Sequence, residues 1–213
     1  MFKDRMEAGF LLAKELEEYS QTDAVILAIP RGGVPLGFIV SQKLNLPLEV
    51  VLSKKIGHPR HKEYAIGAVT LKSRILSDAS ADISSAYIEA ETKKIRTKLS
   101  QRYQEYYGYR KPLSLDDKTL IIVDDGIATG NTMISIIMML QSEHPKKVVV
   151  AVPVAPPDAI RNLKESPFVD EVICPLIPDY FAAVGQFYES FDQVDDIEVI
   201  QLLKKANQSA QAN

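Results

Sequence analysis

The chain has one cysteine, no tryptophan and no long apolar run among its 213 residues. A single cysteine, Cys174, cannot form an intrachain disulfide, which excludes a disulfide-stabilised secreted scaffold and favours a reducing, cytoplasmic location. No stretch approaches the roughly 18 to 20 apolar residues that a membrane-spanning helix needs. Residues 1–5 are charged rather than signal-like. We therefore expect neither a membrane segment nor an export signal.

The chain also lacks an excess of charge of either sign. It has 25 Lys and Arg against 28 Asp and Glu, a net charge of -3 at pH 7. Without a positive excess, no nucleic-acid partner is predicted. The length suits one well-filled core, so we expect a single domain over residues 1–205, followed by a polar, frayed tail over residues 206–213.

The strongest signal is the stretch 120–132, in which a strand runs into a turn and then a helix. Residues 120–123 are all aliphatic, as in a strand buried on both faces of a parallel sheet. Two acids, Asp124 and Asp125, follow directly. Small and hydroxylated residues come next, and residues 133–140 have the apolar pattern of a buried helix. The turn therefore lies between a strand end and a helix start.

A turn in this position is suited to binding a phosphate. Backbone amides at a helix N-terminus have no intrahelical acceptor, and the helix dipole adds positive potential. Gly130 permits a tight turn, and the hydroxyls of Thr129 and Thr132 add donors. Asp124 and Asp125 would repel a phosphate, so they suit neighbouring hydroxyls or a hydrated cation. A ligand with both a phosphate and vicinal hydroxyls, such as a ribose 5-phosphate, fits this pattern.

These thirteen residues resemble the phosphoribosyl pyrophosphate motif of type I phosphoribosyltransferases, and they lack the lysine and glycine spacing of a Walker loop. The alternative is an ordinary strand-turn-helix with solvated acids. The resemblance implies an α/β fold, a parallel sheet flanked by helices, with an added long helix and a C-terminal hood or cover. It assigns Asp124 and Asp125 to the ribose hydroxyls. It assigns phosphate binding to Gly126, Ile127, Ala128, Thr129, Gly130, Asn131 and Thr132.

A second strand-turn-helix unit precedes the first one in the chain. Residues 23–29 form a buried strand, and Arg31, Gly32 and Gly33 follow before a helix that ends near residue 44. Glycine turns before helices are common, so the signal alone is weak. In type I phosphoribosyltransferases, the corresponding loop holds pyrophosphate. The resemblance therefore predicts that Arg31, Gly32 and Gly33 bind the pyrophosphate of the substrate.

Two further basic segments follow. Lys54 and Lys55 stand at the expected exit of a strand over residues 48–52, either as a solvated end or, by the resemblance, as groups that neutralise pyrophosphate. Residues 57–64 read as an exposed loop, which in the family is a lid that excludes water. The candidates for acid or pyrophosphate contacts in this lid, each of which is otherwise a plain surface residue, are His58, Arg60, His61, Lys62 and Glu63. The histidine spacing predicts no metal site.

Amphipathic helices are predicted on both sides of this region. Residues 2–19 form a scaffold helix whose packed face carries Met6, Phe10, Ala13 and Leu16. Residues 78–107 form a long helix whose packed face carries Ile88, Ile95, Leu99, Tyr103 and Tyr106. The long helix is either an added cover or a subunit contact, so a homodimer is possible. Packing is the better interpretation of its tyrosines, although they could stack a base.

The segment 178–191 is rich in aromatic residues and irregular. It resembles in composition the hood that type I phosphoribosyltransferases place over the nucleobase. The aromatic residues that could sandwich a base, or instead plug the core, are Tyr180, Phe181, Phe187 and Tyr188. Residues 194–205 form a final helix.

The resemblance predicts transfer of a phosphoribosyl group from phosphoribosyl pyrophosphate to a nucleobase or another nucleophile, with Mg²⁺ bound mainly through the substrate. The motifs resemble a group of bacterial phosphoribosyltransferases whose acceptor is unassigned. Enzymes acting on hypoxanthine and guanine have an aspartate where this chain has Ala128, so a 6-oxopurine acceptor is disfavoured. The alternative is a sensor that binds phosphoribosyl pyrophosphate or a nucleotide without turning it over.

Overall fold

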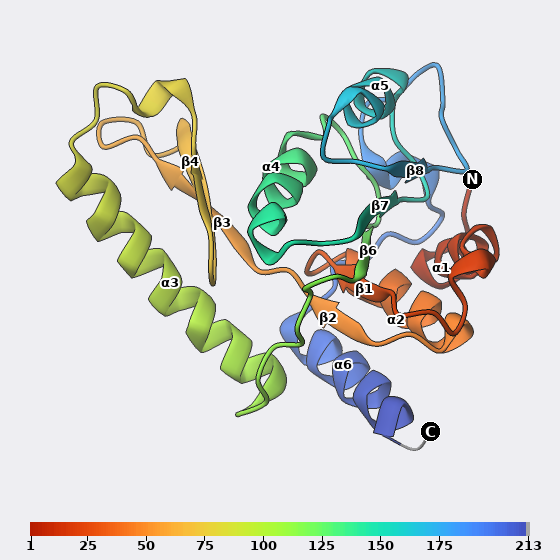
Figure 1. The fold of residues 1–213 in the computed structure, drawn as a ribbon. Helices are drawn as coiled ribbons and strands as arrows, with labels where there is room; N and C mark the ends of the chain where they lie inside the picture. Colours follow the sequence, from red (N-terminus) through yellow and green to blue (C-terminus); the bar gives the residue numbers. More distant parts are fainter. Residues whose placement is uncertain (212–213) are drawn as a thin grey trace.

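The structure, a computed structural model, describes residues 1–211, with the side chains of residues 209–211 excepted. Figure 1 shows its elements in chain order. They are α1 (Arg5–Glu15), β1 (Val25–Ala28), α2 (Gly33–Leu44), β2 (Leu48–Val50), β3 (Ser53–Gly57), β4 (Ala65–Thr70), β5 (Arg74–Leu76), α3 (Ser85–Tyr107), β6 (Thr119–Val123), α4 (Asn131–Leu140), β7 (Lys147–Ala151), α5 (Pro157–Glu165), β8 (Glu171–Ile173) and α6 (Asp196–Gln211). No helix in the described part is long and apolar enough to cross a membrane.

The central sheet is parallel and has the strand order β2-β1-β6-β7-β8. Parallel strands joined by helical crossovers are buried on both faces, which is why β1 is aliphatic throughout and β6 is aliphatic from Leu120 to Val123. Ile26 pairs with Ile121 and Ala28 pairs with Val123. The predicted α/β class with a parallel sheet flanked by helices is confirmed.

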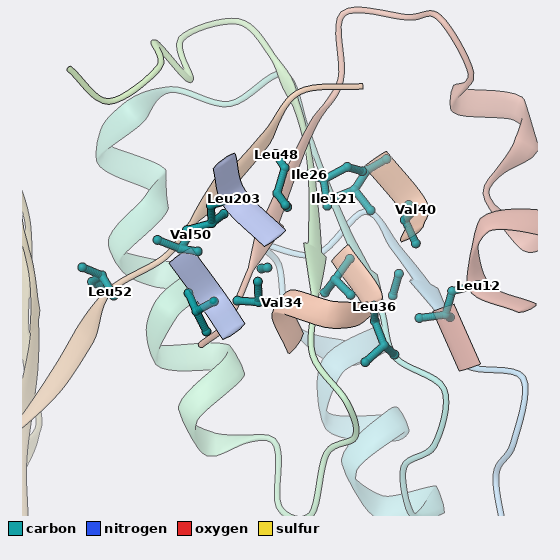
Figure 2. Packing of buried hydrophobic residues seen from close by; sticks show 14 of the residues in the cluster. Leu12, Ile26, Val34, Leu36, Val40, Leu48, Val50, Leu52, Ile121 and Leu203 are labelled. Atoms are coloured by element: carbon teal, nitrogen blue, oxygen red, sulfur yellow. The ribbon is translucent and has the colours of Figure 1, made fainter. Parts of the chain in front are cut away.

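Two apolar clusters sandwich this sheet because successive side chains of a strand point to opposite faces. Ile26 and Ile121 belong to the cluster shared with α1, α2 and α6, in which Val34 and Leu203 also lie (Figure 2). The intervening Leu27 belongs to the cluster on the opposite face, which α4 and α5 cover. The result is a helix-sheet-helix sandwich.

A second, antiparallel sheet has the order β3-β4-β5, and α3 packs along β3 and β4. We call this unit the arm, and Figure 1 shows it projecting from the central sheet. The helix α3 begins at Ser85, later than the predicted residue 78, because the Ser84 hydroxyl caps the amide of Tyr87 at 3.4 Å. All five apolar residues predicted for its packed face are buried.

The predicted packed face of the first helix is half right, because Ala13 and Leu16 are buried as predicted but Met6 and Phe10 are not. Met6 and Phe10 are 40% and 48% exposed, whereas Ala8 and Leu12 are buried. The reason is a close helix contact: a Cβ atom at Gly9 would lie 3.0 Å from Ile39 Cβ of α2. The small residues Ala8 and Gly9 allow this approach, so the face that contains them and Leu12, rather than Met6 and Phe10, lies against the core.

The final helix extends further than the sequence pattern indicated. Helix α6 continues to Gln211, past the predicted end at residue 205. Ala206 is buried, and the Asn207 side chain accepts a hydrogen bond of 2.9 Å from Arg110 Nη1. The predicted fraying from residue 206 onward stays a prediction, and residues 212–213 lie outside the described part.

The tyrosines of α3 pack against neighbouring residues, which was the preferred prediction, rather than stacking on a base. The rings of Tyr103 and Tyr107 lie 4.6 Å apart, and the Tyr107 hydroxyl accepts a hydrogen bond of 3.0 Å from the Val50 amide. Tyr106 donates to Asp196 at the start of α6 over 2.5 Å. Burial and hydrogen bonding leave none of these three rings free to stack a base.

Candidate functional site

Two strand-to-helix turns meet at the carboxyl edge of the central sheet. The strands β1 and β6 are neighbours, and the Ile29 amide extends their ladder by donating to Val123 O at 2.9 Å. A Cβ atom at Gly32 would lie 1.9 Å from Asp125 Oδ2, and one at Gly33 would lie 2.5 Å from Val123 O. A Cβ atom at Gly33 would therefore clash with fixed backbone, whereas one at Gly32 would displace the Asp125 carboxylate, and the structure brings the two predicted loops into contact.

The turn before α4 has the form of an anion-binding helix N-terminus. Gly130 adopts the left-handed conformation with φ of 80°, which few other residues tolerate. Ile134 N donates to Gly130 O as the first helical hydrogen bond, so the amides of the preceding turn have no intrahelical acceptor. Within the described residues, no side chain caps this end. Four of its residues are exposed: Ala128, Thr129, Asn131 and Thr132.

The two acids lie side by side and are partly buried. The Asp125 amide donates to Asp124 Oδ1 at 2.9 Å. Burial raises the pKa of Asp124 well above its usual range, and the neighbouring Asp125 carboxylate raises this pKa further. Burial also raises the pKa of Asp125, but hydrogen bonding from Arg5 opposes that rise. The pair therefore resists carrying two full negative charges.

Arg5 is the residue that the sequence pattern did not reveal. Its Nη2 and Nε atoms lie 2.8 and 2.9 Å from Asp125 Oδ2. The two side chains are 12% and 15% exposed. The sequence of the first helix is amphipathic, which predicts only a structural role. Arg5 and Asp125 are 120 positions apart, so no local sequence pattern predicts their contact. Only the fold shows that this helix delivers a cation to the acids.

The hood segment (residues 178–191) packs directly on the same turn. Tyr188 is 5% exposed and donates a hydrogen bond of 2.6 Å to Asp125 O. A Cβ atom at Gly126 would lie 2.5 Å from Val184 Cγ1, so the loop and the hood segment touch. The rings of Phe181 and Phe187 stack on each other with centroids 5.3 Å apart. Tyr188 thus acts as a plug rather than as one side of a base sandwich.

The predicted basic residues lie around this edge. Arg31 Nη1 is 3.6 Å from Asp196 Oδ2 at the start of α6. Lys54 and Lys55 are inside β3, not at the exit of the parallel strand, because the chain turns after β2 and begins the second sheet. With Asn131 and others they line a cavity of about 460 Å³ between the arm and α4. The lysines therefore lie beside the turn before α4, but on a strand of the second sheet rather than at the end of a parallel strand.

The candidate lid forms the tip of the β3–β4 hairpin. The rings of His58 and His61 lie 5.9 Å apart, and Lys62 Nζ donates to the Tyr87 hydroxyl of α3 at 2.7 Å. Figure 1 shows the tip on the far side of the arm from the central sheet. The role of the lid candidates at the site, Arg60 and Glu63 among them, stays a prediction.

Comparisons with known proteins agree with this geometry. Residues 3–187 match the family model described as the phosphoribosyl transferase domain. A Mycobacterium tuberculosis protein named "Putative phosphoribosyl transferase" is 36% identical over 211 residues, which cover 97% of this chain and 47% of that protein. The chain thus spans about half the length of the curated relatives it matches.

Solved structures show the same similarity. A protein from Thermus thermophilus with a known crystal structure has 37% sequence identity to this chain. The two structures align with a TM-score of 0.83 over 96% of this chain and 98% of the other. A purine phosphoribosyltransferase from Pyrococcus horikoshii is 20% identical, with a TM-score of 0.50 over 90% of this chain and 92% of its own, and shares the fold alone.

Proposed function

Since the chain belongs to the phosphoribosyl transferase domain family, we propose that it transfers the 5-phosphoribosyl group of phosphoribosyl pyrophosphate to a nucleobase or another nucleophile, with release of pyrophosphate. The observation that carries the proposal is the meeting of Asp124 and Asp125 with the Gly32–Gly33 turn and an uncapped helix N-terminus at one sheet edge. In parallel α/β sheets, ligands bind at this edge.

Each part of the edge would bind a different part of the substrate. The amides and hydroxyls of residues 128–132 would hold the 5-phosphate. Asp124 and Asp125 would accept hydrogen bonds from the ribose hydroxyls. Arg31 and the two lysines of β3 would neutralise the pyrophosphate, which needs Arg31 to exchange Asp196 for substrate oxygens.

The reaction is a displacement at C1 of the ribose. The lone pair of the acceptor forms the new bond to C1 while the C1–O bond to pyrophosphate breaks. Pyrophosphate leaves with the electron pair of that bond, and a protonated acceptor nitrogen then loses its proton to the surrounding solution. Positive charge develops on the sugar in the transition state. The carboxylates of Asp124 and Asp125 would stabilise that charge, and exclusion of water would protect the sugar centre.

The side chains of the site fit a magnesium ion that arrives with the substrate. Among residues 1–211 we find no group of three or more His, Cys, Asp or Glu side chains that could hold a metal ion. Mg²⁺ commonly binds substrate phosphates and water with few protein ligands. Bound to the oxygens of phosphoribosyl pyrophosphate, it would neutralise leaving-group charge.

Ala128 is the residue from which we infer a limit on the chemistry of the acceptor. Ala128 is exposed beside the phosphate turn, and its methyl group neither donates nor accepts a hydrogen bond. A 6-oxopurine that needs an acidic partner at this position is therefore a poor acceptor. The proposed function is compatible with other nucleobases or with a different nitrogen nucleophile.

Incubation with labelled phosphoribosyl pyrophosphate, Mg²⁺ and a panel of bases tests the proposal. We expect release of pyrophosphate with at least one base, and a loss of at least about 100-fold in kcat/KM for Asp125→Asn because a transition-state contact is removed. Asp158→Asn, at a surface acid that is 82% exposed, is the matched control and should retain full activity. Unchanged turnover in Asp125→Asn would remove Asp125 from its role, and tight binding without pyrophosphate release would indicate a sensor.

A further inference from the structure

Arg5 occupies a position that the proposed reaction does not explain. Its Nε and Nη2 atoms both contact Asp125 Oδ2, and its Nη1 atom donates to Asp192 O at 2.6 Å. The Phe191 ring covers the guanidinium, with 3.9 Å between its centroid and Cζ. Hydrogen bonds and ring packing thus hold a largely buried cation on the outer face of Asp125.

The backbone keeps this cation in place. Residues 2–5, which we call the strap, run beside the end of the hood segment. Phe2 N donates to Phe187 O at 2.7 Å, and Phe2 O accepts from Glu189 N at 2.9 Å. Lys3 O accepts a third hydrogen bond of 2.9 Å, from Ser190 N. The strap and the hood segment therefore form one unit that carries Arg5 to the acids.

The contact leaves part of the carboxylate available. Both hydrogen bonds from Arg5 end on Oδ2, so they do not use Oδ1 of Asp125. The other charged or titratable groups that face this carboxylate are Asp124, whose pKa the Asp125 charge raises, and the Tyr188 hydroxyl, which donates to the Asp125 carbonyl. Arg5 is thus the cation that offsets the repulsion within the acid pair.

We infer that Arg5 is a positioning residue, which keeps Asp125 ionised and oriented so that Oδ1 can accept a hydroxyl of the bound sugar phosphate. The inference rests on the proposed function, because it concerns the same sugar site. A guanidinium suits this role because it binds a carboxylate through a fixed fork while packing against an aromatic ring. Without it, Asp125 would stay protonated to a higher pH.

The test is the binding of phosphoribosyl pyrophosphate with Mg²⁺, measured by calorimetry between pH 5.5 and 9. For Arg5→Gln we expect affinity at the low-pH end of this range to fall by up to about tenfold, which is the most that a one-unit rise in a carboxyl pKa produces. The midpoint of the pH dependence should rise by about one unit, since an opposite charge at this distance shifts a carboxyl pKa by about one to three units. Raising the pH should restore binding, which would not repair a structural defect.

Two further variants complete the test. Arg5→Lys keeps the charge but not the fork, and should return the pH midpoint most of the way to the wild-type value. Lys3→Gln removes a charge from the exposed side of the same strap and should change neither affinity nor midpoint. An unchanged midpoint in folded Arg5→Gln, or a loss of affinity that high pH does not restore, would overturn the positioning role alone. Absence of binding by the wild-type chain would overturn the proposed function and this role together.

Discussion

At the residue scale, ionised Asp124 lowers the stability of the folded chain, because it is buried beside a second carboxylate. The pKa of Asp124 is higher in the folded chain than in the unfolded chain, so protonation of this acid stabilises the folded chain. This stabilisation is fully present below about pH 4, the pKa of an aspartate in the unfolded chain, and is lost as pH rises through the pKa of the folded chain. Asp124→Asn keeps an oxygen for the Asp125 amide but cannot ionise. We expect the variant to gain about 1 to 2 kcal/mol in free energy of unfolding at pH 8, and little at pH 4.5.

Urea unfolding of wild type and Asp124→Asn at several pH values measures this difference. A stability gain that is the same at pH 4.5 and pH 8 would show that ionisation of Asp124 is not its cause. Sequence alone located the acid pair and the glycines beside it, because their types and spacing are local properties. It could not locate Arg5, since that contact depends on where the first helix lies in the fold.

At the scale of an element, the N-terminus of α4 gives a second prediction. A methyl group at Gly130 would meet no atom closer than 3.8 Å, but its φ of 80° strains any residue with a Cβ. Gly130→Ala should therefore distort the turn and weaken binding of ribose 5-phosphate by roughly tenfold, with about 1 kcal/mol lost in stability. Calorimetric titration of ribose 5-phosphate measures the effect.

Gly108 provides the matched control. It also has a positive φ, of 63°, and follows α3 with no neighbour within 4 Å of a Cβ atom. Gly108→Ala should lower stability and leave sugar-phosphate affinity unchanged. Equal losses of affinity in the two variants would mean that global destabilisation, rather than the turn, governs binding.

Element boundaries were predictable where composition changes sharply. The strand β6 and the helix α4 are separated by a turn of small residues, and both were located within about two residues. The change from β2 to β3 carries no glycine or proline, so residues 48–52 read as one strand with Lys54 and Lys55 at its exit rather than in a strand of their own. The structure has two strands there, in different sheets. Pairing partners distinguish them, and partners are not a local property.

At the scale of the whole molecule, Glu49 joins the arm to the central sheet. This β2 carboxylate is 4% exposed and accepts hydrogen bonds from Arg110 Nη2 at 2.6 Å and from the Leu113 amide at 3.1 Å. Tyr103 donates a longer one, of 3.4 Å. Glu49→Ala leaves these donors without a partner, so we expect a loss of about 2 to 3 kcal/mol in free energy of unfolding.

Chemical denaturation measures this loss. Glu89→Ala is the control, because Glu89 pairs with Arg74 on the surface of the arm and is 67% exposed. A loss below about 0.5 kcal/mol is expected there, and a similar small loss in Glu49→Ala would contradict the role of Glu49. The alternation of strands and helices predicted the parallel sheet. The long helix of the arm was predicted, but the antiparallel pairing of β3, β4 and β5 was not, because pairing partners are not a local property of the sequence.

The ring over Arg5 has a practical consequence. The chain contains no tryptophan, and Phe191 is 36% exposed where it covers the guanidinium. An indole placed at residue 191 would be the sole long-wavelength fluorophore in the protein. Its emission would report directly, in solution and during titration with any sugar phosphate, whether the guanidinium still lies beneath it.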